Sequence, residues 1–310
     1  MSYSIRQYQD SDFDHVLSLC QKTYHLDVIS EDLLKEKIYE DPFYEQELVW
    51  LACDQEQIVG FLMGTCRMDI RGVNYGYVKM MAVDQDYRRN GIARAMYDLL
   101  ETELKQRKVD VMRLGDVPMN YFMPGIDPRY TPALCFAIRM GFDRFMDTSN
   151  LLVDLDNRDW NDPEKIEALK ADQIEVSRAT PEDKQELMAF VKEEWKLWQY
   201  ELEMAYKPEP IGIHIAKLDG KIRAFSAHSA NNKDLPWFGP MGTHPDLRGK
   251  GMGRVLLYHC LEDLKNLGYQ TAIIPWVGPI DFYSHHTGAV VERIFWRYEK
   301  KINLDMRREM

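Results

Sequence analysis

Apolar and polar positions along the chain repeat one order of elements twice. Each half opens with a short alternating segment, at 3–6 and at 174–178, that leads into an acidic turn. Such a turn suits the N-terminus of a helix, where exposed backbone N–H groups favour negative charge. Apolar residues then recur at helical spacing, at Val16, Leu17, Leu19, Leu187, Met188, Phe190 and Val191. The pattern predicts a strand followed by an amphipathic helix at the start of each half.

Two apolar runs joined by a polar turn come next in each half, over 49–62 and over 213–225. Asp219-Gly220 is a strong signal for a β-hairpin turn, and the turn at 54–57 is a weaker one. Both pairs of runs are therefore predicted to be hairpins.

A third apolar run follows at 77–83 and at 237–243, and after a glycine-bearing turn each half continues into a long helical pattern. The apolar face of that pattern consists of Ile92, Met96, Leu99, Leu100 and Leu104 in the first half, and of Met252, Leu256, Cys260 and Leu264 in the second. Because one face of each helix is apolar, we expect both helices to pack on a sheet.

The repeat divides the chain into two domains. The 310 residues suit two domains of roughly 100–200 residues, each able to bury its own core. We expect an N-terminal domain at 1–156, a polar and turn-rich linker at 157–172, and a C-terminal domain at 173–310.

The turns before the two long helices carry the clearest chemical signal. They read Arg88-Arg89-Asn90-Gly91-Ile92-Ala93 and Arg248-Gly249-Lys250-Gly251-Met252-Gly253, and they align without a gap. A glycine there permits a positive φ and a close approach of a ligand to the backbone. The unpaired N–H groups of the helix's first turn then face an anion. A pyrophosphate is the expected occupant of such a turn.

The pattern Arg-x-x-Gly-x-Gly/Ala resembles the acetyl-CoA loop of the GNAT acetyltransferase superfamily, and the resemblance covers both halves. It implies an α/β (α+β) fold of two GNAT-like domains, each with a mixed, mostly antiparallel sheet flanked by helices. It also implies acetyl-CoA as co-substrate, with the backbone near Met81, Val83, Met241 and Thr243 pairing with the pantetheine arm. A Rossmann dinucleotide site is the competing interpretation, but its G-x-G-x-x-G spacing and βαβ context are missing.

The two halves differ where the resemblance places a catalytic tyrosine, five residues before a glycine of the last helix. The second half has Tyr283 ahead of Gly288, whereas the first half has Phe136 ahead of Gly141. In the family, this hydroxyl protonates the departing CoA thiolate, which a phenyl ring cannot do. The second half is therefore expected to be catalytic, and the first half slow or inactive unless another acid substitutes.

The base that deprotonates the amine is left open by the sequence. Candidates in the second half are His228, His214, Glu193 and Glu194, although residues of these types are more often ordinary surface or core residues. The segment 193–201 combines aromatic side chains with carboxylates and is expected either to border the acceptor pocket or to form an amphipathic helix. In the first half, 24–26 matches this region, and 118–132 lengthens the loop before the last helix.

Composition narrows the class of partner. The formal net charge of −11 repels a phosphate backbone, and no basic run interleaved with aromatics offsets it, so nucleic acid is not expected as a partner. The N-terminus has no signal-peptide pattern and no apolar run is long enough to span a membrane. The five cysteines form no CxxC pair, so we expect reduced thiols, a cytoplasmic location and no metal site.

Two classes of function fit these observations. The first is an acetyl-CoA-dependent N-acetyltransferase that acts on the amine of a small molecule by direct attack in the C-terminal half, with a protein or peptide amine as the alternative acceptor. The second is an acyl-CoA-binding regulatory or structural tandem, because the first half keeps the loop at 88–93 beside Phe136.

Overall fold

The chain forms two compact units that do not follow the predicted boundaries. The structure, a computed structural model, describes residues 3–69 and 71–303. Unit 1 combines Met1–Val117, Tyr121–Thr148 and Ile294–Met310, and unit 2 combines Pro118–Asn120 with Ser149–Arg293. The domains expected at 1–156 and 173–310 therefore differ from the compact units at both ends of the second half.

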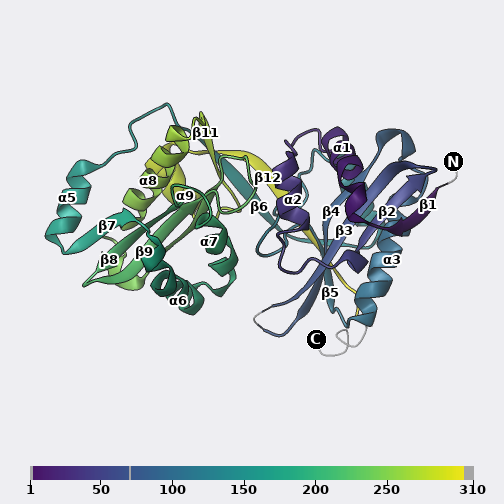
Figure 1. Cartoon of the computed structure of the whole chain (residues 1–310), viewed down its shortest axis with the longest axis horizontal. Helices are drawn as coiled ribbons and strands as arrows, with labels where there is room; N and C mark the ends of the chain where they lie inside the picture. The colour runs from purple at the N-terminus through teal and green to yellow at the C-terminus, as the bar shows by residue number, and fades with distance from the viewer. Residues whose placement is uncertain (1–2, 70, 304–310) are drawn as a thin grey trace. The chain divides into compact units, whose positions relative to one another are not determined.

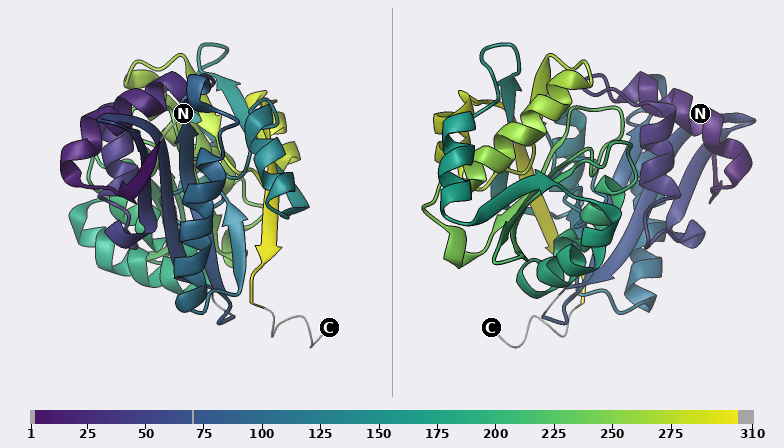
Figure 2. Two further views of the ribbon diagram at one scale, coloured as in Figure 1. Left: turned by 90° about the vertical axis from the view of Figure 1, so that its right-hand side faces the viewer. Right: turned by 60° about the vertical axis from the view of Figure 1, so that its left-hand side comes forward.

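An exchange of strands explains this difference. The last strand of the first half, β6 (Asp143–Asp154), ends in unit 2, where its residues 151–154 pair antiparallel with β11 (Thr271–Ile274). The last strand of the second half, β12 (Val290–Lys301), ends in unit 1, where its residues 299–301 pair antiparallel with β5 (Val111–Leu114). Figure 2 shows the yellow end of β12 running beside β5. A sequence repeat gives the order of strands but not the sheet edge that each strand joins.

Unit 1 is a mixed, mostly antiparallel sheet in the order β1-β2-β3-β4-β5-β12. β4 and β5 pair in parallel, and the other neighbours pair antiparallel. Its remaining elements are β1 (Ser4–Gln7), α1 (Phe13–Thr23), α2 (Glu31–Ile38), β2 (Val49–Asp54), β3 (Gln57–Met68), β4 (Asn74–Val83), α3 (Ile92–Gln106) and α4 (Thr131–Arg139).

Alternating side chains of this sheet build two cores, one on each face. Phe61 and Ala82 join the core under α1 and α2, whereas Leu62 joins the core under α3 and α4, and Met81 packs against it. The period of two along each strand places neighbouring residues on opposite faces, so the apolar runs of the sequence cover both. The hairpin and the long helix predicted in this half are confirmed as β2–β3 and α3.

Unit 2 repeats this arrangement with a four-stranded antiparallel sheet, β7-β8-β9-β10, next to the pair β11 and β6. Helices α6 and α7 pack with one core of this unit, and α8 and α9 with the others (Figure 1). Its elements are α5 (Pro163–Ala171), β7 (Ile174–Arg178), α6 (Lys184–Glu194), α7 (Gln199–Ala205), β8 (Ile213–Leu218), β9 (Lys221–His228), β10 (Phe238–Thr243), α8 (Met252–Asn266) and α9 (Ile280–Thr287). The predicted hairpin and long helix of this half are confirmed as β8–β9 and α8.

The segment expected as a linker at 157–172 contains α5, which begins after an Asp162 side chain that caps it at Lys165 N. Leu169 of α5 is buried in one core of unit 2 together with Ile174. The helix therefore belongs to the folded unit, and the cap followed by Pro163 is the local signal that marks its start.

The packing of the segment after β12 in unit 1 can be tested through the stability of the protein. Ile302 follows β12, is 8% exposed and packs in the core of unit 1 under α3. Ile302→Ala should lower the free energy of unfolding by about 2–5 kcal/mol. Native-state hydrogen exchange should show the loss of protection at amides of β4 and β5.

The matched control is Ile294→Ala, because Ile294 lies in β12 itself and is 49% exposed. It should change the free energy of unfolding by less than about 0.5 kcal/mol. Loss of protection confined to β8, β9 and β10 in the Ile302 variant would contradict the assignment of this segment to unit 1.

Candidate functional site

The two glycine turns adopt the same backbone conformation. Gly91 has a φ of 83° and precedes α3, and Gly251 has a φ of 78° and precedes α8. Two residues earlier, Arg89 and Gly249 also have positive φ values, 69° and 77°. In the described part of the chain no side chain caps either helix, so the first-turn N–H groups are available to an anion.

Beyond Val78, strand β4 has a free edge. Its parallel pairing with β5 ends where Val78 faces Leu114. The amide of Asp84 donates to the carbonyl of Val59 on β3, and hydrogen-bonding direction alternates along a strand. Met81 and Val83 therefore direct their N–H and C=O groups away from β3, toward the free edge.

Side chains hold this edge in the structure. The hydroxyl of Tyr24 accepts from Met81 N at 3.0 Å and donates to Met81 O at 3.1 Å. The Nε of Arg88 donates to Val83 O at 3.2 Å. Burial raises the pKa of Tyr24 well above its ordinary value, so this group is a phenol over the working pH range. Both positions are those expected to pair with the pantetheine arm.

A cavity of about 760 Å³ in unit 1 runs along this edge. Its lining includes the glycine turn and four arginines, Arg88, Arg89, Arg94 and Arg139. The cavity brings together most of the first-half residues expected at the cofactor, namely Met81, Val83, Arg88, Arg89, Gly91, Ile92 and Ala93. The side chain of Asn90 instead donates to the carbonyls of Tyr87 and Arg88. The positive charge and the exposed N–H groups suit an anionic ligand beside the turn.

Other lining residues of the cavity are aromatic and polar. They include His25, Tyr130 and Asp127, and the ring of His25 packs edge-on against Tyr130 at 5.0 Å between centroids. Asp127 is 1% exposed and accepts from the guanidinium of Arg129. Residues of the longer loop before α4 thus form part of the cavity wall, together with Tyr24 and His25 of the segment 24–26.

Sequence reasoning missed several of these groups, including Arg94, Arg139, Lys79 and Asp127. Arg94 had a signal, because the second half has Arg254 at the matching position. Lys79 and Asp127 had none, because nothing in a linear pattern shows that a charged residue is buried beside a cavity.

In the second half, several side chains lie close to the glycine turn. A Cβ atom placed on Gly253 would lie 3.3 Å from the ring of Phe282 and 3.9 Å from the side chain of Met241. The matching residues in unit 1 are Ala93 and Cys135, and both line the cavity. Arg254 in the first turn of α8 forms an ion pair with Asp162 at 2.5 Å. The side chains that would meet a ligand here contact the protein itself.

The other residues expected at the second-half loop lie around α8. Arg248, Gly249, Lys250 and Gly251 precede the helix, and Met252 begins it and is buried. Lys250 pairs with Asp172 at 3.5 Å, and Thr243 ends β10. The side chain of Lys165 lies 2.6 Å from a Cβ placed on Gly251, so α5 crowds this turn.

Tyr283 lies in the core of unit 2. Its side chain packs edge-on against Phe238 and Phe282, at 5.9 Å and 5.2 Å between ring centroids, and the residue is 8% exposed. Burial raises the pKa of Tyr283 to about 12. Of the two adjacent aromatics in α9, Phe282 is the one that contacts Gly253 of the cofactor turn.

Two of the four candidate bases of the second half, His214 and His228, belong to a buried polar cluster. His214 and His228 each contact Oδ2 of Asp263, at 2.7 Å and 3.1 Å, and Arg178 donates to Oδ1 at 2.6 Å. Burial lowers the pKa of His214, and Asp263 opposes that shift. Asp263 lies near the end of α8, about 18 Å along the helix from Gly251 at 1.5 Å per residue. This cluster is remote from the turn.

The segment 193–201 is not an open pocket wall. Glu193 and Glu194 are exposed at the end of α6. Trp195 stacks on Trp198 and packs edge-on against Phe225, and its ring would meet a Cβ on Gly242 at 2.8 Å. These aromatic side chains cover the sheet of unit 2.

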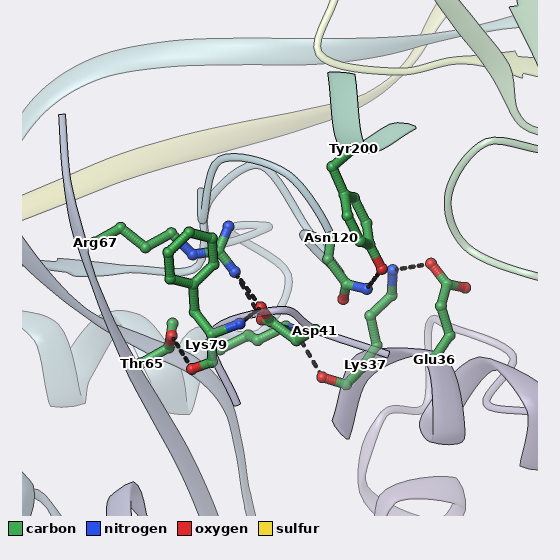
Figure 3. A network of polar contacts seen from close by, with 9 residues as sticks. Glu36, Lys37, Asp41, Thr65, Arg67, Lys79, Asn120 and Tyr200 are labelled. Atoms are coloured by element: carbon green, nitrogen blue, oxygen red, sulfur yellow. Dashed lines mark hydrogen bonds and ion pairs between the residues drawn. The ribbon is translucent and has the colours of Figure 1, made fainter. Parts of the chain in front are cut away.

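A buried ionic cluster lies beside the β4 edge in unit 1 (Figure 3). A bulge in the pairing of β3 with β4 leaves Lys79 between two registers, and this lysine lines the cavity. Its Nζ donates to Oδ2 of Asp41 and to the carbonyl of Lys37, both at 2.6 Å. Arg67 donates to both oxygens of Asp41 at 2.7 Å. Burial opposes the charge of Asp41, but Lys79 and Arg67 hold the pKa of this carboxyl below its usual value.

The chain belongs to the acetyltransferase (GNAT) family. The family's sequence profile matches residues 13–121 and 171–287, well over half of the chain and once in each half. None of the curated protein sequences compared matches it.

Three solved structures resemble the chain over nearly its whole length. The glucosamine N-acetyltransferase region of a fungal multi-domain GH3 β-N-acetylglucosaminidase has a TM-score of 0.80 at 20% identity, and the match covers 96% of this chain and 38% of that one. An N-acetyltransferase of Sphaerobacter thermophilus has a TM-score of 0.69 at 14% identity, and the match covers 96% of this chain and 95% of that one. A tandem GNAT protein of the clavulanic acid biosynthesis pathway has a TM-score of 0.68 at 16% identity, and the match covers 97% of this chain and 98% of that one. These likenesses confirm the predicted tandem fold.

Two expectations of absence concern the described residues only. None of the helices within 3–69 and 71–303 is long and apolar enough to cross a membrane. Within the same ranges, no group of three or more histidine, cysteine or acidic side chains is arranged to hold a metal ion.

Lys79 gives a testable dependence of stability on pH. Burial lowers its pKa from 10.5 to about 7, although Asp41 opposes the shift. The unfolded chain has the ordinary lysine pKa near 10.4, so above pH 7 unfolding takes up a proton at this residue. The contribution of Lys79 to the free energy of unfolding should therefore rise with pH, by up to about 1.4 kcal/mol per unit.

Urea unfolding of wild type and Lys79→Met between pH 7 and 9 measures this contribution. The stability of the variant relative to wild type should fall as the pH rises. Lys105→Met, in which a half-exposed lysine of α3 is replaced, should follow the wild-type curve. A difference between wild type and Lys79→Met that stays constant across this range would show that Lys79 is fully charged in the folded protein.

Proposed function

We propose that this protein is an acetyl-CoA-dependent N-acetyltransferase in which unit 1 binds the cofactor and transfers the acetyl group to the amine of a small molecule. The cavity of about 760 Å³ along the free edge of β4 carries this proposal. It joins an anion-binding turn, an open strand edge and a polar, aromatic lining within one unit.

The chemistry of the lining fits the parts of acetyl-CoA in order. The pyrophosphate suits the turn at Gly91, where helix N–H groups and arginines supply positive charge. The amides of the pantetheine arm suit the N–H and C=O groups of Met81 and Val83, as an added strand would. Bound there, the cofactor supplies a thioester carbonyl that an amine nitrogen can attack.

The aromatic lining of the cavity supports an amine of modest size as the acceptor. Tyr130 and His25 offer aromatic faces to an ammonium group. The fungal structure with the TM-score of 0.80 is named as a glucosamine N-acetyltransferase region. An amino sugar is therefore the first acceptor to test, and protein or peptide amines are the alternative class.

Unit 2 is assigned a supporting role in this proposal. The sequence favoured its catalysis because of Tyr283, but Phe282, Met241 and Trp195 occupy the space around its turn and sheet. Its glycine turn keeps the conformation of the first, so the second candidate function is a regulatory or structural unit derived from the same repeat.

Binding stoichiometry tests which unit holds the cofactor. Calorimetric titration of the wild type with acetyl-CoA should give one site per chain. Cys135→Phe should abolish binding, because it introduces into the cavity the aromatic ring that fills the matching position of unit 2. Phe282→Ala is the matched control and should keep one site of wild-type affinity. Loss of binding in the Phe282 variant alone would assign the cofactor to unit 2.

Turnover tests the assignment of the catalytic unit. Release of CoA thiol should be measured with glucosamine, other amino sugars, polyamines, amino acids and peptides as acceptors. Tyr283→Phe removes only a hydroxyl of the unit 2 core, so kcat should stay within about twofold of wild type. A general acid in that position would instead lower kcat by at least about 100-fold. The absence of turnover with every amine tested would contradict the proposal that this protein is an N-acetyltransferase.

A further inference from the structure

The first half needs a proton donor that its sequence alignment with the second half does not provide. When an amine displaces CoA, the sulfur leaves as a thiolate, and a positioned acid speeds this step by roughly 10²–10⁴. Phe136 lines the cavity at the position that matches Tyr283, and its ring packs edge-on against Tyr97 at 5.7 Å. It contributes surface to the cavity but no proton.

Three tyrosines line the cavity in unit 1, and their hydroxyls have different partners. The hydroxyl of Tyr130 donates to Asp27 at 2.5 Å, and that of Tyr87 donates to Asp54 at 3.0 Å. The hydroxyl of Tyr24 instead lies on the free edge of β4, bonded to both backbone groups of Met81. Of the three, Tyr24 is the one placed where the thioester arm is proposed to bind.

The position of Tyr24 is well defined by its neighbours. Its ring packs edge-on against Phe122 at 5.3 Å and against Tyr130 at 6.0 Å between centroids, and the residue is 7% exposed. A ring held in this way keeps its hydroxyl at the level of Met81. An arm added to β4 would lie about 4.8 Å from it, one strand spacing away.

The bonds of Tyr24 to Met81 satisfy two backbone groups that would otherwise be buried without partners, at a cost of about 1–3 kcal/mol each. An amide of the arm can make the same two bonds. The thioester sulfur is separated from the last amide of the arm by only two methylene groups. A hydroxyl displaced from Met81 by that amide is thus left beside the sulfur.

We propose that Tyr24 closes the edge of β4 in the free protein, is displaced from Met81 by the pantetheine arm, and then protonates the departing sulfur. This role rests on the proposed function of unit 1. The amine nitrogen forms its bond to the carbonyl carbon, and the C–S bond breaks with its electron pair on sulfur. The proton of the Tyr24 hydroxyl passes to that sulfur, and the proton lost by the nitrogen restores the phenol. No oxidant, reductant or further reactant is needed.

Two measurements on the full-length protein separate this role from a structural one. Tyr24→Phe should lower kcat by about 100-fold or more. Its dissociation constant for acetyl-CoA, measured by calorimetry, should stay unchanged or decrease several-fold, because the competitor for Met81 is gone. Tyr44→Phe is the matched control, since its hydroxyl has no hydrogen-bond partner in the described structure and its ring packs against the same core. It should retain wild-type kcat and affinity.

A rescue variant keeps the test decisive. Phe136→Tyr in the Tyr24→Phe background places a hydroxyl on α4 in the same cavity and should recover part of the lost kcat. Wild-type kcat in Tyr24→Phe would overturn the proposal, and so would a parallel loss of kcat and acetyl-CoA affinity, which would show a structural role. Failure of the wild type to bind acetyl-CoA would refute the proposed function of unit 1, and the role of Tyr24 would fall with it.

Discussion

The free edge of β4 is the constraint on which the site in unit 1 depends. A parallel neighbour satisfies β4 up to Val78, and beyond that point Met81 and Val83 direct polar backbone groups into a cavity. Buried N–H and C=O groups require partners. Tyr24 and Arg88 supply them through hydrogen bonds to Met81 and Val83. In the function proposed here, a strand-like ligand takes over these bonds.

The two halves share one local backbone conformation but differ in the side chains around it. The turns at Gly91 and Gly251 share their backbone angles, and each lies before an amphipathic helix. What differs is the volume of the side chains around them. Cys135 and Ala93 leave a cavity, whereas Phe282 packs on Gly253 in unit 2. Because protein interiors are close-packed, the difference of one aromatic ring at matched positions changes the space left beside the turn.

A cluster of buried charges lies near the bulge of β4, beside the same cavity. The carboxylate of Asp41 accepts hydrogen bonds from Arg67, from Lys79 and from the amide of Phe43. These donors balance its negative charge. Lys79 is displaced by the bulge from the regular alternation of the strand, and this places it at the cavity wall. Such clusters are costly to form, and a lowered lysine pKa is the expected consequence of burial.

Local sequence determined the elements and the chemistry of the turns. Apolar periodicity predicted the hairpins and the long helices, and Gly91 and Gly251 were expected at positive φ because only glycine adopts it easily before a helix. The repeat also predicted the tandem family fold. These features depend on residues close in sequence, so a linear pattern contains them.

Tertiary structure alone decided which sheet each last strand joins and which residues line the cavity of unit 1. The boundaries of the compact units differ from the repeat because β6 and β12 pair with strands of the other half, and no local pattern encodes a partner more than a hundred residues away. Tyr24 and Met81 are likewise distant in sequence, and their contact arises only when α1 packs on the sheet. Tyr283 was singled out by its position in a motif, but whether a hydroxyl faces a cofactor or a core depends on the neighbours that packing provides.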